Sequence, residues 1–167
     1  MSSGRSAAPW HVGFVASLPR RRVAAGALFR DSAGRVLLVE PTYKPEWDLP
    51  GGMVEAGESP TAACRREVLE ELGLDRPAGR LLAIDWVPST AELPDGLMIV
   101  YDGGVLTDAE IASIVRQPEE IASVAFVHPD EVGARTPASL ARRIAGCLDA
   151  LGSGEALSLE DGRRPAG

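Results

Sequence analysis

The chain has 167 residues, of which 45% are hydrophobic, 25% charged and 5% aromatic, a mixture that excludes a disordered or fibrous protein. Acidic residues outnumber lysines and arginines by 24 to 17, and the resulting net charge of −7 opposes binding through general attraction to nucleic-acid phosphates. Two cysteines are too few for the disulfide framework of a small secreted scaffold. No apolar run reaches the roughly 20 residues that span a bilayer. We therefore expect a cytoplasmic domain with no extended nucleic-acid partner and no membrane attachment.

The two ends of the chain are expected to lie outside the folded domain. Residues 1–20 begin with a Ser-, Gly- and Ala-rich stretch and lack the features of a signal peptide, so we predict a flexible tail or an edge strand. The domain itself should cover residues 21–152. Residues 153–167 mix glycine, proline and charge and are predicted to form a flexible C-terminal tail.

Two strands open the predicted domain, at residues 23–30 and 35–40, and the turn-like residues 31–34 between them predict a hairpin. A loop at 41–50, bounded by prolines, then leads into Gly51-Gly52. The later elements should be strands at 80–87, 97–101 and 121–127 and helices at 108–116 and 136–151. Alternating strands and helices in one domain indicate a mixed sheet covered by helices.

A helix at 60–72 matters most for function. It should begin after Ser59 as N-cap and stop at Gly73. On a wheel of about 100° per residue, Glu70 and Glu71 fall within about 60° of Glu67, so three carboxylates share one face. The wheel assigns four residues to the packing face, Ala62, Val68, Leu69 and Leu72.

Three glutamates on a helix are often an ordinary solvated surface. However, neighbouring carboxylates repel each other unless something neutralises them. Mg²⁺ suits this task because it prefers carboxylate, carbonyl, water and phosphate oxygens, and Mn²⁺ could replace it. The preceding Gly51 and Gly52 would let a ligand approach the main chain closely.

These residues resemble the Nudix box. The pattern is Gly52, five residues, Glu58, seven residues, and then the run Arg66-Glu67-Val68-Leu69-Glu70-Glu71-Leu72-Gly73-Leu74. Every fixed position of the box is present, and the lead-in Trp47-Asp48-Leu49-Pro50-Gly51-Gly52 is also similar to that of the family. The resemblance implies an α/β Nudix fold, in which an α/β/α sandwich surrounds a mixed sheet, and a MutT-type hydrolase.

Residue by residue, the resemblance implies a metal site. Glu67 and Glu71 would be the principal ligands, and Glu70 a further ligand or a water holder. The carbonyl of Gly51 or Gly52 would complete the coordination. A distant acid, Glu119 or Glu120, would add a carboxylate, and we select Glu120.

The resemblance also implies catalytic and substrate contacts. Glu67 is the expected general base, and Arg66 should orient the glutamates. Glu58 should anchor the helix or border the substrate, and Gly51 should approach the substrate. Trp47 could stack on a base, although packing is the favoured alternative.

The implied reaction is Mg²⁺-dependent hydrolysis of the diphosphate linkage of a small nucleoside diphosphate derivative, such as ADP-ribose, a nucleoside triphosphate or a nucleotide sugar. The alternative is a Nudix-fold domain that senses a nucleotide without cleaving it, although such domains commonly lose box glutamates. An isoprenoid diphosphate isomerase uses a cysteine ahead of the box, and none precedes Cys64.

Arg20, Arg21 and Arg22 either face solvent or contact substrate phosphates or another subunit. A homodimer is left open.

Overall fold

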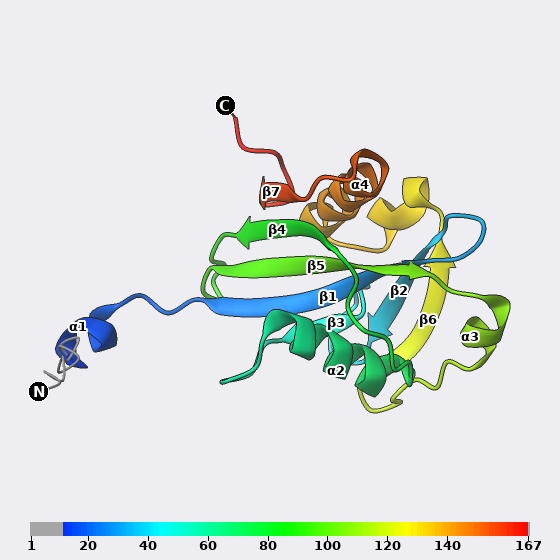
Figure 1. The fold of residues 1–167 in the computed structure, drawn as a ribbon, viewed down its shortest axis with the longest axis horizontal. Coiled ribbons are helices and arrows are strands. Elements are labelled where there is room, and N and C mark those ends of the chain that lie inside the picture. The colour runs from blue at the N-terminus through cyan, green and yellow to red at the C-terminus, as the bar shows by residue number, and fades with distance from the viewer. Residues whose placement is uncertain (1–11, 167) are drawn as a thin grey trace, which may run out of the picture.

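The computed structural model describes residues 12–166 of the chain (Figure 1). Its helices and strands, in chain order, are α1 Val12–Ser17, β1 Arg22–Arg30, β2 Val36–Pro41, β3 Gly51–Met53, α2 Pro60–Leu72, β4 Leu81–Val87, β5 Gly96–Val105, α3 Asp108–Ala112, β6 Ile121–Val127, the 3₁₀ helix η1 Pro129–Ala134, α4 Ala138–Ser153 and β7 Leu157–Glu160. No helix in this part of the chain has the length and apolar character needed to cross a bilayer.

The strands form one mixed sheet in the order β6-β2-β1-β5-β4-β7, with β3 added beside β1. The pairs β1–β5 and β4–β7 are parallel, whereas the other neighbours are antiparallel. Helix α2 lies against one face of the sheet and α4 against the other (Figure 1). The α/β/α sandwich predicted from the sequence is confirmed.

Alternating side chains on β1 divide the core into two layers. Ala25, Ala27 and Phe29 pack in the layer beneath α2, together with Val68 and Leu72 of that helix. Leu28, on the opposite face, packs in a second layer with residues of α4 and η1. Even-numbered positions of this part of β1 therefore face α4.

The hairpin predicted for the first two strands is wrong beyond its turn. Strands β1 and β2 pair only at Arg30 and Val36. Farther from the turn, β1 pairs with β3 instead of β2. On the other strand, Val39 of β2 forms a bridge with Asp48 of the loop that follows β2. The loop and β3 thus fill the gap where the two strands separate, and they bring Gly51-Gly52 between the sheet and α2.

The bounds of α2 were predicted correctly. The Ser59 hydroxyl accepts a hydrogen bond from the Ala62 N–H at 3.2 Å, and Gly73 ends the helix in a left-handed conformation. The division of its faces was partly wrong, because Ala62 and Leu69 are exposed, Leu69 to 46%, whereas Glu71 is only 7% exposed. Strand β3, which the sequence did not predict, covers the helix at Glu71 and leaves Leu69 outside the contact.

The C-terminal segment is ordered, contrary to the predicted flexible tail. Residues 157–160 form β7 alongside β4, and Leu159 is buried in the layer beneath α4. Beyond β7, the Gly162 N–H donates to Oδ1 of Asp85 at 3.0 Å. The other oxygen of this fully buried carboxylate accepts from Arg143 Nε of α4 at 2.6 Å. The segment therefore fastens α4 to the sheet.

Two smaller predictions also need correction, and two elements were not predicted. Residues 12–17 form a helix rather than an edge strand, and residues 1–11 lie outside the described part of the chain. The helix predicted at 108–116 already ends at Ala112, capped by Ser113. Neither the 3₁₀ helix η1 nor the strand β3 was predicted.

The pair of Asp85 and Arg143 should be important for stability. An Asp85→Ala variant leaves a guanidinium buried without its partner, which costs about 3–5 kcal/mol. We expect urea denaturation, followed by circular dichroism, to show a loss of this size in the free energy of unfolding. The matched variant Asp75→Ala opens an exposed pair with Arg65 and should cost less than about 1 kcal/mol. Equal losses in the two variants would contradict the proposed role of the buried pair.

Candidate functional site

The two glycines of β3 bring the main chain against α2. A Cβ atom on Gly52 would overlap the Glu67 carboxyl group, so a larger residue here would displace that side chain. Gly51 has a φ of 145° and lies against Gly26 and the Ala25 carbonyl. Only glycine combines this backbone conformation with so close an approach.

Main-chain hydrogen bonds show which way the polar groups of β3 point. Two ladder bonds flank the pair of Gly52 and Ala25, from Ala27 N to Pro50 O at 2.9 Å and from Val54 N to Val23 O at 2.8 Å. Because bonded pairs recur at every second residue of an antiparallel ladder, Gly52 directs its own N–H and carbonyl toward β1. The N–H and carbonyl of Gly51 therefore point away from β1, toward α2. Of the two carbonyls considered from the sequence, the one available to a ligand is that of Gly51.

Glu71 is a carboxylate buried between α2 and β3. Its Oε2 accepts a hydrogen bond from the Gly51 N–H at 2.9 Å, and it forms no ion pair within residues 12–166. Burial raises the pKa of Glu71 to about 8, and the nearby charges of Glu67, Asp48 and Glu120 act in the same direction. A group in this environment favours either a proton or a bound cation.

Arg66 holds the neighbouring carboxylates in place. Its Nη1 donates to Oε1 of Glu67 at 2.8 Å and to Oε2 of Glu70 at 3.1 Å. Its Nε and Nη2 donate to the two oxygens of Glu58, at 2.9 and 3.0 Å, and Nη2 also donates to the Met53 carbonyl. Every nitrogen of the guanidinium group is thus engaged, and α2 is joined to β3 and to the loop before the helix.

Glu58 acts on the site through Arg66. Hydrogen bonding to Arg66 lowers the pKa of Glu58, and its Oε2 also accepts the Glu55 N–H at 3.1 Å. Both oxygens are therefore occupied by the protein. The contacts support helix anchoring, one of the two roles considered from the sequence, rather than direct substrate binding.

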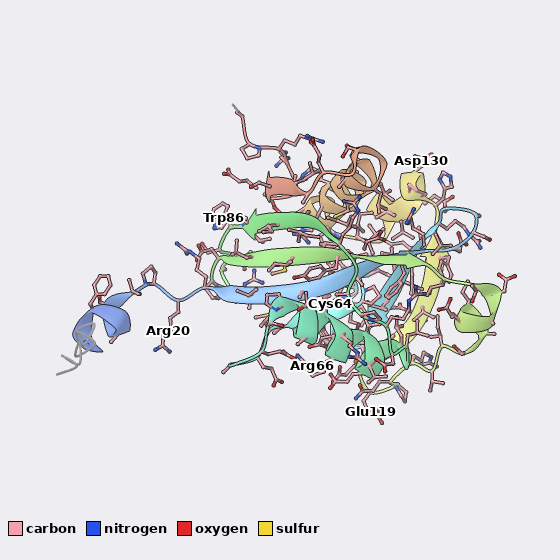
Figure 2. All side chains as sticks on the ribbon, viewed as in Figure 1. Arg20, Cys64, Arg66, Trp86, Glu119 and Asp130 are labelled. Atoms are coloured by element: carbon pink, nitrogen blue, oxygen red, sulfur yellow. The ribbon has the colours of Figure 1, made fainter. Side chains whose placement is uncertain are left out.

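Glu70 and Glu120 lie at the edge of the acidic group. Half of the Glu70 side chain is exposed, and its contact is with Arg66. The charge of Glu120 contributes to the raised pKa values of Glu67 and Glu71, for which burial is the main cause. The loop before Glu120 is fastened to the end of α2, where Gln117 N–H donates to the Glu71 carbonyl at 3.3 Å. This attachment carries Glu120 to the site. Figure 2 shows Arg66 and Glu119 on the α2 side of the molecule.

The chemistry of these donors fits a hard divalent cation. Carboxylates and a free carbonyl are the ligands that Mg²⁺ prefers, and buried Glu71 has no positive partner in the described part of the chain. Within residues 12–166, no three acidic, histidine or cysteine side chains are close enough together to enclose an ion as they stand. Arg66 accounts for part of this spacing, since it draws Glu67 and Glu70 to its own Nη1.

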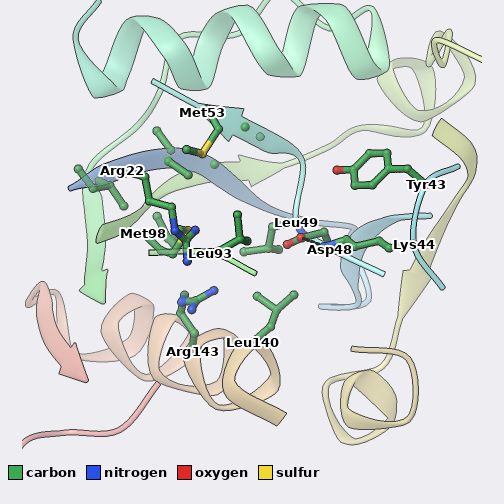
Figure 3. A pocket seen from close by; sticks show the side chains of 17 residues that line it. Arg22, Tyr43, Lys44, Asp48, Leu49, Met53, Leu93, Met98, Leu140 and Arg143 are labelled. Atoms are coloured by element: carbon green, nitrogen blue, oxygen red, sulfur yellow. Dashed lines mark hydrogen bonds and ion pairs between the residues drawn. The ribbon is translucent and has the colours of Figure 1, made fainter. Parts of the chain in front are cut away.

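A cavity of about 330 Å³ adjoins the acidic residues, on the other side of β3 (Figure 3). Gly51 and Gly52 line it and also contact the glutamates of α2, so β3 separates the two spaces. The rest of its wall comes from β1, β5, α4, Met53 of β3, the loop before β3 and the loop between β4 and β5, with Leu49, Met98 and Leu140 among its apolar residues. This size and mixed lining are typical of a small-molecule site.

The structure does not bring Trp47 to this cavity. Its ring packs against the core layer of α4 and is covered by the Arg135 guanidinium, 4.8 Å from the ring centre. The packing alternative therefore holds, rather than base stacking. Two residues without a predicted role, Tyr43 and Asp48, line the cavity close to Glu71. Only Asp48 had a signal in the sequence, its place in the lead-in to the box.

Comparisons with known proteins agree with this geometry. A NUDIX domain model matches residues 20–148. A MutT-like protein of Streptomyces ambofaciens is 30% identical over 145 residues, which cover 86% of this chain and 86% of that protein. An RNA pyrophosphohydrolase of Gluconacetobacter diazotrophicus is 35% identical over 93 residues, which cover 50% of this chain and 54% of the relative.

A solved structure shows the same fold. The MutT protein of Methanosarcina mazei superimposes with a TM-score of 0.66 at 23% identity, and the match covers 83% of this chain and 99% of that one. The family model and the Streptomyces relative each span most of the chain. The chain is therefore a member of the Nudix (MutT-type) family of hydrolases, which act on pyrophosphate bonds.

Proposed function

We propose that the protein hydrolyses the diphosphate linkage of a small nucleoside diphosphate derivative with the help of Mg²⁺. The observation that carries this proposal is the buried carboxylate of Glu71, which meets the Gly51 main chain beside a cavity of ligand size. Glu67, Glu70, Glu71 and Glu120, together with the Gly51 carbonyl, would hold the metal. When bound, Mg²⁺ would screen the negative oxygens of the diphosphate and make a bound water more acidic.

Glu67 is suited to accept the proton of the attacking water. Burial raises the pKa of Glu67 above its usual value, which makes its carboxylate a stronger base. The water oxygen forms a bond to one phosphorus, the bridging P–O bond breaks, and the water proton passes to Glu67. Arg66 fixes the position of Glu67 during this step, and Glu58 fixes Arg66.

The cavity beyond β3 would hold the part of the substrate that does not react. Because β3 separates the two spaces but pairs only with β1 among the described strands, a diphosphate at the glutamates would extend into the cavity past the free edge of β3. ADP-ribose, nucleotide sugars and nucleoside triphosphates all combine a diphosphate with a group of suitable size. The net charge of −7 favours such small substrates over a long nucleic acid.

A substrate panel tests this function directly. ADP-ribose, UDP-glucose and nucleoside triphosphates are incubated with Mg²⁺ or Mn²⁺ in ¹⁸O-labelled water, and the phosphorus that gains ¹⁸O is identified by mass spectrometry. We expect release of a nucleoside monophosphate or of pyrophosphate, with one ¹⁸O atom per turnover and no reaction in excess EDTA. Tight binding without turnover across the panel would refute hydrolysis and favour a nucleotide-sensing domain.

A further inference from the structure

The guanidinium group of Arg143, on α4, faces the cavity. The residue is 8% exposed, and it lines the cavity together with Leu140 of the same helix. Figure 3 shows its guanidinium group directed from α4 toward the strands. A guanidinium this deeply buried usually has partners for all its nitrogens.

The hydrogen bonds of Arg143 are concentrated on one side of the group. Nε donates to Asp85 at 2.6 Å, and Asp85 is itself held by the Gly162 N–H at 3.0 Å. Neither Nη1 nor Nη2 donates a hydrogen bond within residues 12–166. The buried carboxylate thus fixes the orientation of Arg143, and the donors that remain are those that face the cavity.

Arg22 approaches the same cavity from the sheet. It lies at the start of β1, an even number of residues before Leu28, and therefore on the face toward α4. Its Nε donates to the Pro94 carbonyl at 2.7 Å. It forms no ion pair with any residue in the described range 12–166, so its charge is not neutralised there.

Three cationic side chains, Arg22, Lys44 and Arg143, line the cavity, although the protein as a whole is acidic. Lys44 pairs with Asp48 and Arg143 with Asp85, each at 2.6 Å, so the charge of Arg22 is the one left unpaired within residues 12–166, and Arg143 contributes its free Nη donors. Two guanidinium groups with unused donors, each fixed through Nε, match the forked geometry by which arginine binds oxyanions. Apolar side chains around them would keep water from competing with such a ligand.

We propose that Arg22 and Arg143 form an anion subsite for a second acidic group of the substrate, a phosphate or a carboxylate separate from the scissile diphosphate. The subsite deepens the proposed function, on which it rests for the identity of the substrate. The subsite selects, among nucleoside diphosphate derivatives, those that carry an additional oxyanion on the part held in the cavity.

Titration with inorganic phosphate tests the subsite without catalysis. The protein is kept free of divalent metal at constant ionic strength, and the arginine Nε–H signals are followed by NMR. We expect saturable shifts for Arg22 and Arg143, which persist in Glu71→Gln, a variant that removes hydrolysis. Phosphate binding at the subsite can therefore be confirmed even if the protein does not hydrolyse the panel, and hydrolysis can be confirmed even if phosphate does not bind there.

Two adjacent arginines provide a matched comparison. Arg22→Met and Arg21→Met each remove one charge, but Arg21 pairs with Asp95 and does not line the cavity. Arg22→Met should weaken phosphate binding about tenfold or more, whereas Arg21→Met should leave it within about twofold. Arg143→Lys keeps a cation beside Asp85 but removes the fork, and it should also weaken binding. No saturable response in the wild type, or equal effects of Arg21→Met and Arg22→Met, would overturn the proposal.

Two pairs of compounds identify the source of the anion. NADPH differs from NADH by one phosphate, and UDP-glucuronate differs from UDP-glucose by one carboxylate. We expect the wild type to bind the more acidic member of one pair about tenfold more tightly, and Arg22→Met to lose this preference. The pair that shows the preference tells whether the group is a phosphate or a carboxylate. Equal affinities within both pairs would show that the subsite does not serve the substrate.

Discussion

A Glu67→Gln variant should fold normally and lose about 10²–10⁴-fold in kcat, the usual contribution of a general base. Its carboxylate is held at 2.8 Å by Arg66 Nη1 and lies against Gly52. Glutamine has nearly the same shape but cannot take a proton from water at neutral pH. The measurement is kcat from pH 5 to pH 9 on the best substrate of the panel, with circular dichroism to check the fold.

The shape of the pH profile distinguishes a base from a structural residue. Burial raises the pKa of Glu67, and a base works only when deprotonated, so wild-type kcat should fall at low pH. The residual activity of Glu67→Gln should lack this acidic limb. Glu119→Gln makes the same chemical change on the neighbouring loop and should change kcat less than about twofold. If Glu67→Gln keeps a tenth of wild-type activity together with the acidic limb, the base is another residue.

The sequence predicted the parts of the site that depend on local structure. Ser59 and Gly73 mark the ends of α2 by cap chemistry that needs no distant contact. The box spacing places Arg66 next to Glu67 and one helical turn from Glu70, and the structure joins all three through Nη1. The link between Glu58 and Arg66 also lies within this short stretch.

Contacts between distant segments were beyond the reach of the sequence. A helical wheel treats α2 as if one smooth face met the protein, and it therefore placed Leu69 inward and Glu71 outward. In the fold, β1 and β2 pair at Arg30 and Val36 and separate with distance from the turn. Strand β3 occupies the gap and covers Glu71. Local periodicity contains no information on this separation. Arg143 is a similar case, since only the buried Asp85 of β4 reveals its role.

Glu71→Gln should abolish hydrolysis and yet stabilise the metal-free protein at alkaline pH. Burial raises the pKa of Glu71 from its ordinary 4.5 to about 8 in the folded state. Between these two values the unfolded chain has released the proton and the folded chain keeps it. Wild-type stability should therefore fall as pH rises through this window, by up to about 1.4 kcal/mol per pH unit from this group. Glutamine does not titrate, so at pH 9 the variant should be more stable than the wild type by about 2–4 kcal/mol.

Urea unfolding in EDTA at pH 5 and pH 9 measures this difference. At pH 5 the protonated Glu71 resembles glutamine, so the two proteins should differ little there. Added Mg²⁺ should stabilise the wild type at pH 9, because a ligand that binds only the folded state shifts the equilibrium, and it should stabilise Glu71→Gln much less. Glu131→Gln, on the exposed surface of η1, controls for the loss of one charge and should run parallel to the wild type. If the free energies of unfolding of the wild type and of Glu71→Gln changed equally with pH and with Mg²⁺, burial of the Glu71 carboxylate would not be the reason that the site binds a cation.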